Sequence, residues 1–232
     1  MNPKPLLLCL SVVALGITAL AVPSAASAEA TMFHNELKGT IIEGEQLKRA
    51  GGLLDEKKFN AGTITCESIT FSGTMATETT ETLTLSAQSK KCSMGANTVE
   101  VLTNKCNYVF HSGEKDVKGN LEGNLDIECQ NAGESIDYVA KMGGVTKCTI
   151  HVPAQQGLTS VTYTNEAAEG EEQRHLHVDV NVTGINYKQT AGTGTGACTG
   201  FGEEVKKDGS WTGTELFRGI DGKGGHIALW VE

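Results

Sequence analysis

The stretch His175-Leu176-His177-Val178-Asp179-Val180-Asn181-Val182 decides the fold class, because polar and apolar side chains alternate along it without a break. Residues two apart share a face of a β-strand, whereas a helix repeats about every 3.6 residues. On a strand, Leu176, Val178 and Val180 therefore point to one side and the polar side chains point to the other. The pattern predicts a half-buried strand with its valines in a core.

The same alternation returns along most of the chain, and turns such as Met142-Gly143-Gly144 and Asp208-Gly209 separate the alternating stretches. Short alternating runs between turn signals indicate an all-β fold rather than alternating strands and helices. We therefore expect an antiparallel β-sandwich, built as one domain or as two small β halves. The expected strands are Thr63–Phe71, Glu81–Leu85, Thr98–Leu102, Cys106–Phe110, Leu121–Cys129, Ile136–Ala140, Cys148–Val152, Leu158–Tyr163, Leu176–Val182, Trp211–Phe217 and Ile227–Val231.

Residues 1–28 have the order of regions found in a secretory signal peptide. Lys4 supplies the positive charge, an apolar run extends from Leu6 to Val22, and Ala26-Ser27-Ala28 has the small residues of a cleavage site. Pro23 ends any helix between the run and that site. An uncleaved membrane anchor is the alternative. The pattern favours cleavage and a secreted or cell-surface protein.

Residues 29–60 differ from the rest, because Glu43–Asp55 contains several charges and a weakly helical stretch that Gly51-Gly52 ends. We expect a partly ordered N-terminal arm there. The chain is thus divided into a signal peptide at 1–28, an arm at 29–60 and a β domain at 61–232.

Six cysteines remain once Cys9 is removed with the signal, and an even number in an exported chain predicts disulfides. Zinc ligation is the alternative, but it favours pairs such as C-x-x-C, and no two of these cysteines are so close. Six cysteines allow 15 pairings, of which pairing between sequence neighbours is our expectation. Each bond would stabilise the fold by roughly 2–4 kcal/mol. The cysteines are Cys66, Cys92, Cys106, Cys129, Cys148 and Cys198.

The composition narrows the class of partner. Without Lys4, the mature chain has 18 Lys and Arg against 28 Asp and Glu, a formal charge of −10. Nucleic acids and anionic membranes bind basic patches, so neither is an expected partner. No second apolar run approaches the ~20 residues that span a bilayer. We expect an extracellular or cell-surface ligand and no cofactor.

His175, His177 and Asp179 are the candidate metal ligands, because they share one face of the predicted strand. An H-x-H strand with a third ligand is one way to hold Zn²⁺. The alternative is that these side chains form the solvated face of an amphipathic strand.

Trp211 and Trp230 are the candidate binding residues, because an exposed tryptophan is a common anchor for recognition. Trp230 should face away from its neighbours Leu229 and Val231. A carbohydrate-binding module is the function that such an anchor would suit. Packing at the edge of the core is the alternative role.

The sequence carries no recognisable catalytic motif. It has no Gly-x-Ser-x-Gly nucleophile turn, and three disulfides would leave no free cysteine as a nucleophile. The leading hypothesis is a non-enzymatic exported protein that binds a ligand or forms part of the cell surface. The alternative is a secreted hydrolase or metal-dependent enzyme that uses the His175, His177 and Asp179 face.

Several short motifs resemble a group of uncharacterised, cysteine-containing secreted β proteins of soil bacteria. They include Thr63–Cys66, Phe71–Thr74, Cys106–Gly113, Cys148–Pro153 and Gly184–Tyr187. The resemblance implies a secreted β protein built around these cysteines. It implies no activity and no site.

Overall fold

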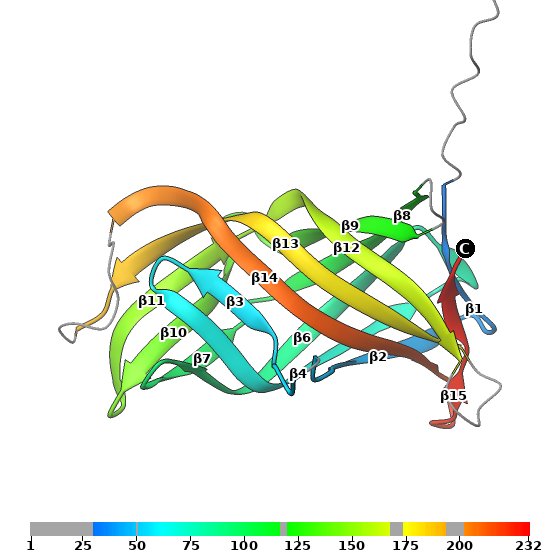
Figure 1. Cartoon of the computed structure of the whole chain (residues 1–232), viewed down its shortest axis with the longest axis horizontal. Coiled ribbons are helices and arrows are strands. Elements are labelled where there is room, and N and C mark those ends of the chain that lie inside the picture. The colour runs from blue at the N-terminus through cyan, green and yellow to red at the C-terminus, as the bar shows by residue number, and fades with distance from the viewer. Residues whose placement is uncertain (1–29, 50, 117–119, 168–173, 194–201) are drawn as a thin grey trace, which may run out of the picture.

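The computed structural model describes residues 30–49, 51–116, 120–167, 174–193 and 202–232. Within these ranges the regular secondary structure consists of strands alone (Figure 1), so the expected all-β class is confirmed. The strands are β1 (Phe33–Asn35), β2 (Thr40–Gln46), β3 (Glu56–Phe59), β4 (Gly62–Met75), β5 (Thr79–Thr80), β6 (Thr82–Met94), β7 (Asn97–Leu102), β8 (Cys106–Lys115), β9 (Leu121–Cys129), β10 (Ser135–Met142), β11 (Val145–Pro153), β12 (Gln155–Ala167), β13 (Arg174–Ala191), β14 (Gly202–Ile220), β15 (His226–Ile227) and β16 (Leu229–Val231).

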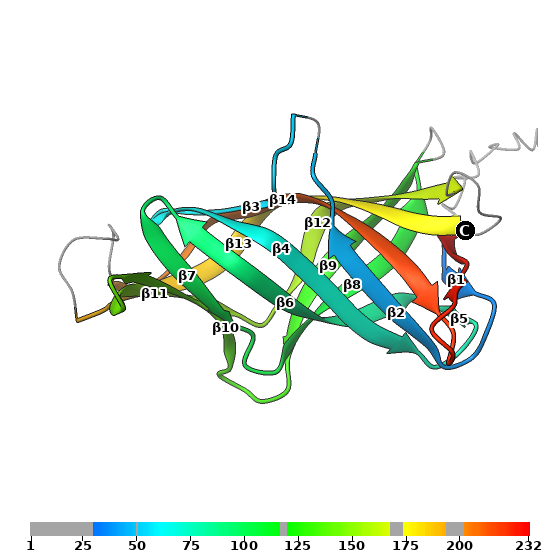
Figure 2. The same ribbon diagram turned by 90° about the horizontal axis from the view of Figure 1, so that it is seen from below.

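Thirteen of the described strands form one antiparallel sheet that closes on itself as an elongated tube (Figures 1 and 2). The long strands β4, β6, β13 and β14 belong to both halves of the tube. In one half they are joined by β8, β9 and β12 on one side and by β2 on the other. In the other half they are joined by β7, β10 and β11, and by β3. The long strands therefore exchange neighbours midway, at positions that we call forks.

The expected antiparallel pairing is confirmed, whereas the two-sheet sandwich is not. A sandwich has two separate sheets packed face to face, but the pairings β6–β4 and β11–β13 make this sheet continuous. Period-2 alternation shows which side chains face inward, and both arrangements bury one face of each strand. The strand pattern alone therefore does not distinguish them.

The interior of the tube is filled by the inward side chains of the alternating strands. Leu176, Val178, Val180 and Val182 of β13 are all fully buried, as the alternation predicted. Aromatic rings pack in the centre, where Phe71 contacts Phe110, Phe217 and Trp211 and Tyr108 contacts Phe71 and Trp211.

A separate three-stranded sheet, β16-β1-β5, lies at one end of the tube, on the right in Figures 1 and 2. Its residues Phe33, Leu229 and Val231 are almost completely buried. The Asn165 side chain of β12 accepts a hydrogen bond from the backbone N–H of Val231 and donates one to its carbonyl, at 2.9 and 2.7 Å. This contact holds the last strand against the tube.

Residues 29–60, expected to form a partly ordered arm, contribute β1, β2 and β3 to the two sheets. The helical expectation for Glu43–Asp55 is wrong at its start, because β2 continues to Gln46. Ile42 and Gly44 face inward there, and a Cβ on Gly44 would lie 2.5 Å from the Phe217 ring. Tertiary packing thus selects a strand over a weak helical preference.

Two of the expected disulfides are present, Cys66–Cys92 and Cys106–Cys129. Each joins direct cross-strand neighbours, the first between β4 and β6 and the second between β8 and β9. Both bonds lie beside the fork at which β7 and β10 replace β8 and β9. Cys148 is also disulfide-bonded, and Cys198, its expected partner, lies outside the described residues.

The Gln155 side chain takes the place of a pairing strand at the fork of β13, where the neighbour of this strand changes from β12 to β11. β13 pairs with β12 through Arg174–Val180 and with β11 through Lys188–Ala191. Between them, Gln155 accepts a hydrogen bond from the N–H of Asn186 at 2.8 Å and donates one to its carbonyl at 3.2 Å. The exchange of neighbours therefore leaves these backbone groups of Asn186 satisfied.

The described residues include no helix with the length and apolar character that crossing a membrane requires.

Candidate functional site

A chain of polar contacts crosses the outer face of β10, β11 and β13. Asp137 and His151 are direct neighbours on β10 and β11, and Thr190 lies diagonally from His151 on β13. The residues beside them on the first two strands, Tyr138 and Ile150, are buried in the interior. The alternation of each strand therefore directs the three polar side chains outward together.

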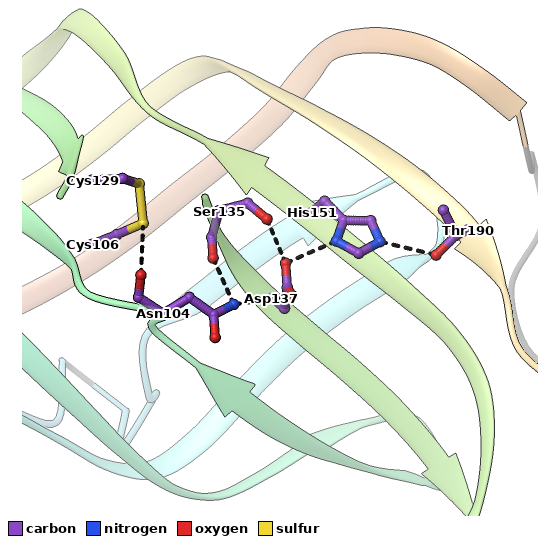
Figure 3. Close-up of polar contacts among 7 residues, drawn as sticks. All are labelled: Asn104, Cys106, Cys129, Ser135, Asp137, His151 and Thr190. Carbon is purple, nitrogen blue, oxygen red and sulfur yellow. Dashed lines mark hydrogen bonds and ion pairs between the residues drawn. A yellow bond between two sulfur atoms is a disulfide. The ribbon is translucent and has the colours of Figure 1, made fainter. Parts of the chain in front are cut away.

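Figure 3 shows the geometry of this chain. His151 Nδ1 lies 2.8 Å from Asp137 Oδ1, and Nε2 lies 2.9 Å from the Thr190 hydroxyl. Ser135 donates a hydrogen bond of 2.6 Å to Asp137 Oδ1, and Asn104 donates one of 3.1 Å to Oδ2. The hydrogen bonds from Ser135 and Asn104 thus orient the carboxylate for its contact with the imidazole.

This arrangement sets the tautomer of His151. A carboxylate accepts the proton of Nδ1, which leaves Nε2 as the acceptor for the Thr190 hydroxyl. A carboxylate, an imidazole and a hydroxyl in this order form the relay of acyl-transfer enzymes. We call Asp137, His151 and Thr190 the hydroxyl relay. Sequence reasoning missed it because the three residues come from three strands.

A second imidazole–carboxylate pair lies on the outer face of β8 and β9. His111 Nε2 is 3.0 Å from Asp126 Oδ2, and Asp126 Oδ1 accepts a hydrogen bond of 2.6 Å from the N–H of Gly157. The Asp126 side chain is 9% exposed and that of His111 is 32% exposed. A buried, doubly held carboxylate therefore orients a half-exposed imidazole.

His111 lines a surface depression of about 720 Å³, which also includes residues of β9 and β12 and the segments before β1 and β6. This volume is within the range of roughly 300–1,000 Å³ of small-molecule sites. Its other side chains are mainly polar, among them Glu81, Glu122, Asn124 and Thr162. We call this the His111 depression. Its residues suit a ligand that forms hydrogen bonds rather than an apolar one.

The acidic side chains give the His111 depression a negative character. Glu114 and Glu122 are direct cross-strand neighbours, and both line it together with Glu81. Lys115 is the cation among the lining residues. Like charges opposite each other are unfavourable in a sheet, so a ligand with a positive group would relieve the repulsion.

The predicted metal ligands His175, His177 and Asp179 all lie on the outer face of β13, but they have different partners. His177 pairs with Glu166 at 3.5 Å, and Asp179 accepts a hydrogen bond of 2.7 Å from the Thr214 hydroxyl. The ring of His175 lies edge-on to that of His226. The described part of the chain has no group of three or more His, Cys, Asp or Glu side chains arranged to hold a metal. The metal site stays a prediction.

The two candidate tryptophans lie in different environments. Trp211 is 2% exposed, in the interior of the tube, so a ligand could reach it only through an opening in the sheet. Trp230 faces away from the buried Leu229, as predicted, stacks on His34 at 5.3 Å and lies beneath the Arg174 guanidinium. Ligand binding by either tryptophan stays a prediction.

Three ionisable residues inside the tube were not expected. Asp55, Lys57 and Glu215 are each less than 10% exposed. Burial, and then the nearby Asp55, raises the pKa of Glu215 well above its usual value, and burial lowers the pKa of Lys57. One signal was available: Glu215 is in phase with Trp211 and Phe217 on an alternating strand.

The chain matches no protein-family model, and its comparisons with the curated proteins and with solved structures give no match.

Proposed function

We propose that the protein is an exported, non-enzymatic binding protein whose ligand site is the His111 depression. The observation that carries this proposal is the oriented imidazole at a polar depression of ligand size. Asp126 holds Nε2 of His111, so Nδ1 can accept a hydrogen bond from a ligand. The rigid, disulfide-linked sheet around it would keep the lining side chains in place without a bound ligand.

Export rests on three features. The first is the expected cleavage after Ala28. Among the described residues, the first buried side chain is that of Thr31, whose hydroxyl donates to the Ser112 carbonyl while the Ser112 hydroxyl donates to the Thr31 carbonyl. Cleavage after Ala28 would leave these contacts intact. The other two features are the disulfides, which are typical of exported proteins, and the negative charge, which favours a partner other than nucleic acid.

Ligand binding is tested with the mature, disulfide-bonded chain and two probe sets, neutral oligosaccharides and polyamines. NMR chemical-shift changes are expected to concentrate at His111, Asn124 and Thr162. His111→Ala should weaken binding at least tenfold, whereas His226→Ala, a histidine on β15, should bind like the wild type. Saturable binding that His111→Ala leaves unchanged would place the site elsewhere. No binding of either probe set would contradict the proposed ligand class.

A secreted hydrolase is the second candidate, and the hydroxyl relay favours it. In acyl transfer the Thr190 oxygen would attack an ester carbonyl while its proton passes to His151 Nε2, and that proton would leave with the alcohol as the ester C–O bond breaks. Water would then hydrolyse the acyl ester on Thr190, which releases the acid and restores the hydroxyl. A fluorophosphonate probe should then label Thr190, and ester hydrolysis should fall in Thr190→Val but not in Thr164→Val on β12. Unlabelled protein with no ester hydrolysis above background would exclude this candidate.

A further inference from the structure

Glu215 occupies an inward position of β14, between Trp211 and Phe217 on the same face of the strand. Its side chain has no exposed surface. Neither of its carboxyl oxygens receives a hydrogen bond from an N–H or O–H group of the described residues. The carboxyl of Asp55 lies close enough to raise the pKa of Glu215, in addition to the effect of burial. Two neighbouring carboxyl groups in a buried site are favoured with one proton between them, because two negative charges would repel each other.

The hydrogen bonds to Asp55 indicate which of the two carries the charge. Its Oδ2 accepts a hydrogen bond from the Trp211 indole, and its Oδ1 accepts one from the backbone N–H of Thr214, both at 3.2 Å. A carboxylate that accepts N–H donors is favoured in its ionised form. The N–H donors therefore favour the negative charge on the Asp55 side of the pair and the proton on the Glu215 side, which has no such donor among the described residues.

The other charged group beside this pair is Lys57 of β3. Its Nζ lies 4.3 Å from the centre of the Trp211 ring, on which it is held by a cation–π contact. Lys57 is near enough to Asp55 and Glu215 for both to favour its charged form, against the cost of burial. One positive and one negative charge with a neutral Glu215 leave the cluster without net charge.

The remaining groups that face the cluster are neutral. Tyr108 of β8 and Tyr138 of β10 contact each other, and burial raises the pKa of Tyr108 to about 12. From β2 and β4, the inward residues Ile42 and Phe71 are apolar.

The pair lies at a fork of β14. This strand pairs with β2 from Glu215 onward and with β3 through Ser210–Thr212. In the gap, the N–H of Thr214 donates to Asp55 and its carbonyl accepts a hydrogen bond of 2.8 Å from the N–H of Leu47. The Asp55 side chain thus bridges the gap along β14 between its pairing with β3 and its pairing with β2. We call this gap the seam between β2 and β3.

We propose that Asp55 and Glu215 share one proton in the folded protein, and that loss of this proton opens the seam between β2 and β3 on β14. A second negative charge beside Asp55 would have no hydrogen-bond donor among the described residues and no exposure to solvent, so the two carboxylates would repel each other in a medium of low polarity. The least costly relief is the withdrawal of Asp55 from the gap. The fork would then act as a pH-sensitive element of the fold.

The sign of the effect follows from the proton balance. The pKa of Glu215 is raised by burial and by Asp55, so above the usual glutamate pKa the folded chain binds one proton more than the unfolded chain. Stability must therefore fall as pH rises toward the raised pKa, and the unfolding equilibrium constant grows about tenfold per pH unit. Lys57 has a lowered pKa and contributes with the opposite sign at alkaline pH.

Glu215→Gln isolates this contribution, because its amide donates to Asp55 as the protonated acid does but cannot release a proton. Urea unfolding is measured between about pH 5 and pH 8. The unfolding constant of the wild type should grow relative to that of Glu215→Gln by up to tenfold per pH unit. The control Glu128→Gln, at an exposed position of β9, should follow the wild type. Parallel pH dependence of wild type and Glu215→Gln would overturn the proposal.

Infrared spectroscopy of the wild type keeps the proposal testable if Glu215→Gln does not fold. Near pH 7 the exposed carboxyls are ionised, so a protonated-carboxyl band should remain and should disappear as the pH is raised. Its absence near pH 7 would refute the shared proton. Amide exchange at Leu47 and Thr214 should accelerate as the band disappears, beyond the intrinsic effect of pH; unchanged protection would refute the opening of the seam.

Discussion

Trp211 Nε1 donates a hydrogen bond to Oδ2 of Asp55, a residue 156 positions earlier in the chain. The contact joins β14 to the segment that enters β3, at the fork where β2 leaves. The same carboxylate accepts a hydrogen bond from the N–H of Thr214, so Asp55 also supplies the backbone acceptor that the missing strand does not.

Removal of the Asp55 carboxylate should therefore destabilise the fold strongly. Asp55→Ala leaves the indole N–H and the N–H of Thr214 buried without their acceptor, and each such group costs roughly 1–3 kcal/mol. We expect a loss of about 2–6 kcal/mol in the free energy of unfolding, measured by urea denaturation. Glu128→Ala on the surface should change it by less than ~0.5 kcal/mol. Equal stability of the two variants would contradict the role given to Asp55.

Gly213 should tolerate no side chain, because a Cβ there would lie 2.3 Å from Asp55 Oδ2. Gly213→Ala must therefore displace Asp55 or the strand, at a cost of about 2–4 kcal/mol by the same loss of hydrogen bonds. Gly222→Ala is the matched control, since a Cβ at Gly222 meets no atom within 4 Å. Thermal melting of both variants checks this, and a similar effect in the two would show that Asp55 does not need this space.

A non-reducing peptide map of the secreted protein should contain the linked pairs Cys66–Cys92 and Cys106–Cys129, together with Cys148–Cys198 as the predicted third pair. The first peptide should begin at Glu29 if the signal is cleaved as expected. Double replacement of Cys106 and Cys129 by serine should cost about 2–4 kcal/mol in unfolding free energy. A map with other pairings, or with the signal retained, would contradict the fold or the export prediction respectively.

Zinc should not stabilise the mature protein measurably, because His175, His177 and Asp179 are turned to separate partners. Zinc that binds tightly to the folded state alone would add about 2.7 kcal/mol to the free energy of unfolding at a hundredfold excess over Kd, and the melting temperature would rise accordingly. A shift with zinc that is lost in His177→Ala and retained in His226→Ala would instead establish the predicted metal site.

The functional residues show where sequence reasoning ended. The outward position of His151 follows from alternation along its strand, but its contacts with Asp137 and Thr190 depend on the register of β10, β11 and β13. The position of Glu215 in phase with Trp211 was readable as an anomaly. The partner of Glu215 was not readable, because Asp55 lies far earlier in the chain.

The sequence by itself determined most of the strands after residue 60 and the face of each of these strands that is buried. These properties are local, because the period of two along a strand fixes the direction of each side chain. The tertiary structure decided that the sheet closes into a tube and that its long strands exchange neighbours at forks. It also decided that Asp55 and Gln155 complete those forks and that acidic side chains meet around His111. Such contacts depend on which distant strands pair and in which register, and that choice is made by the packing of the whole interior.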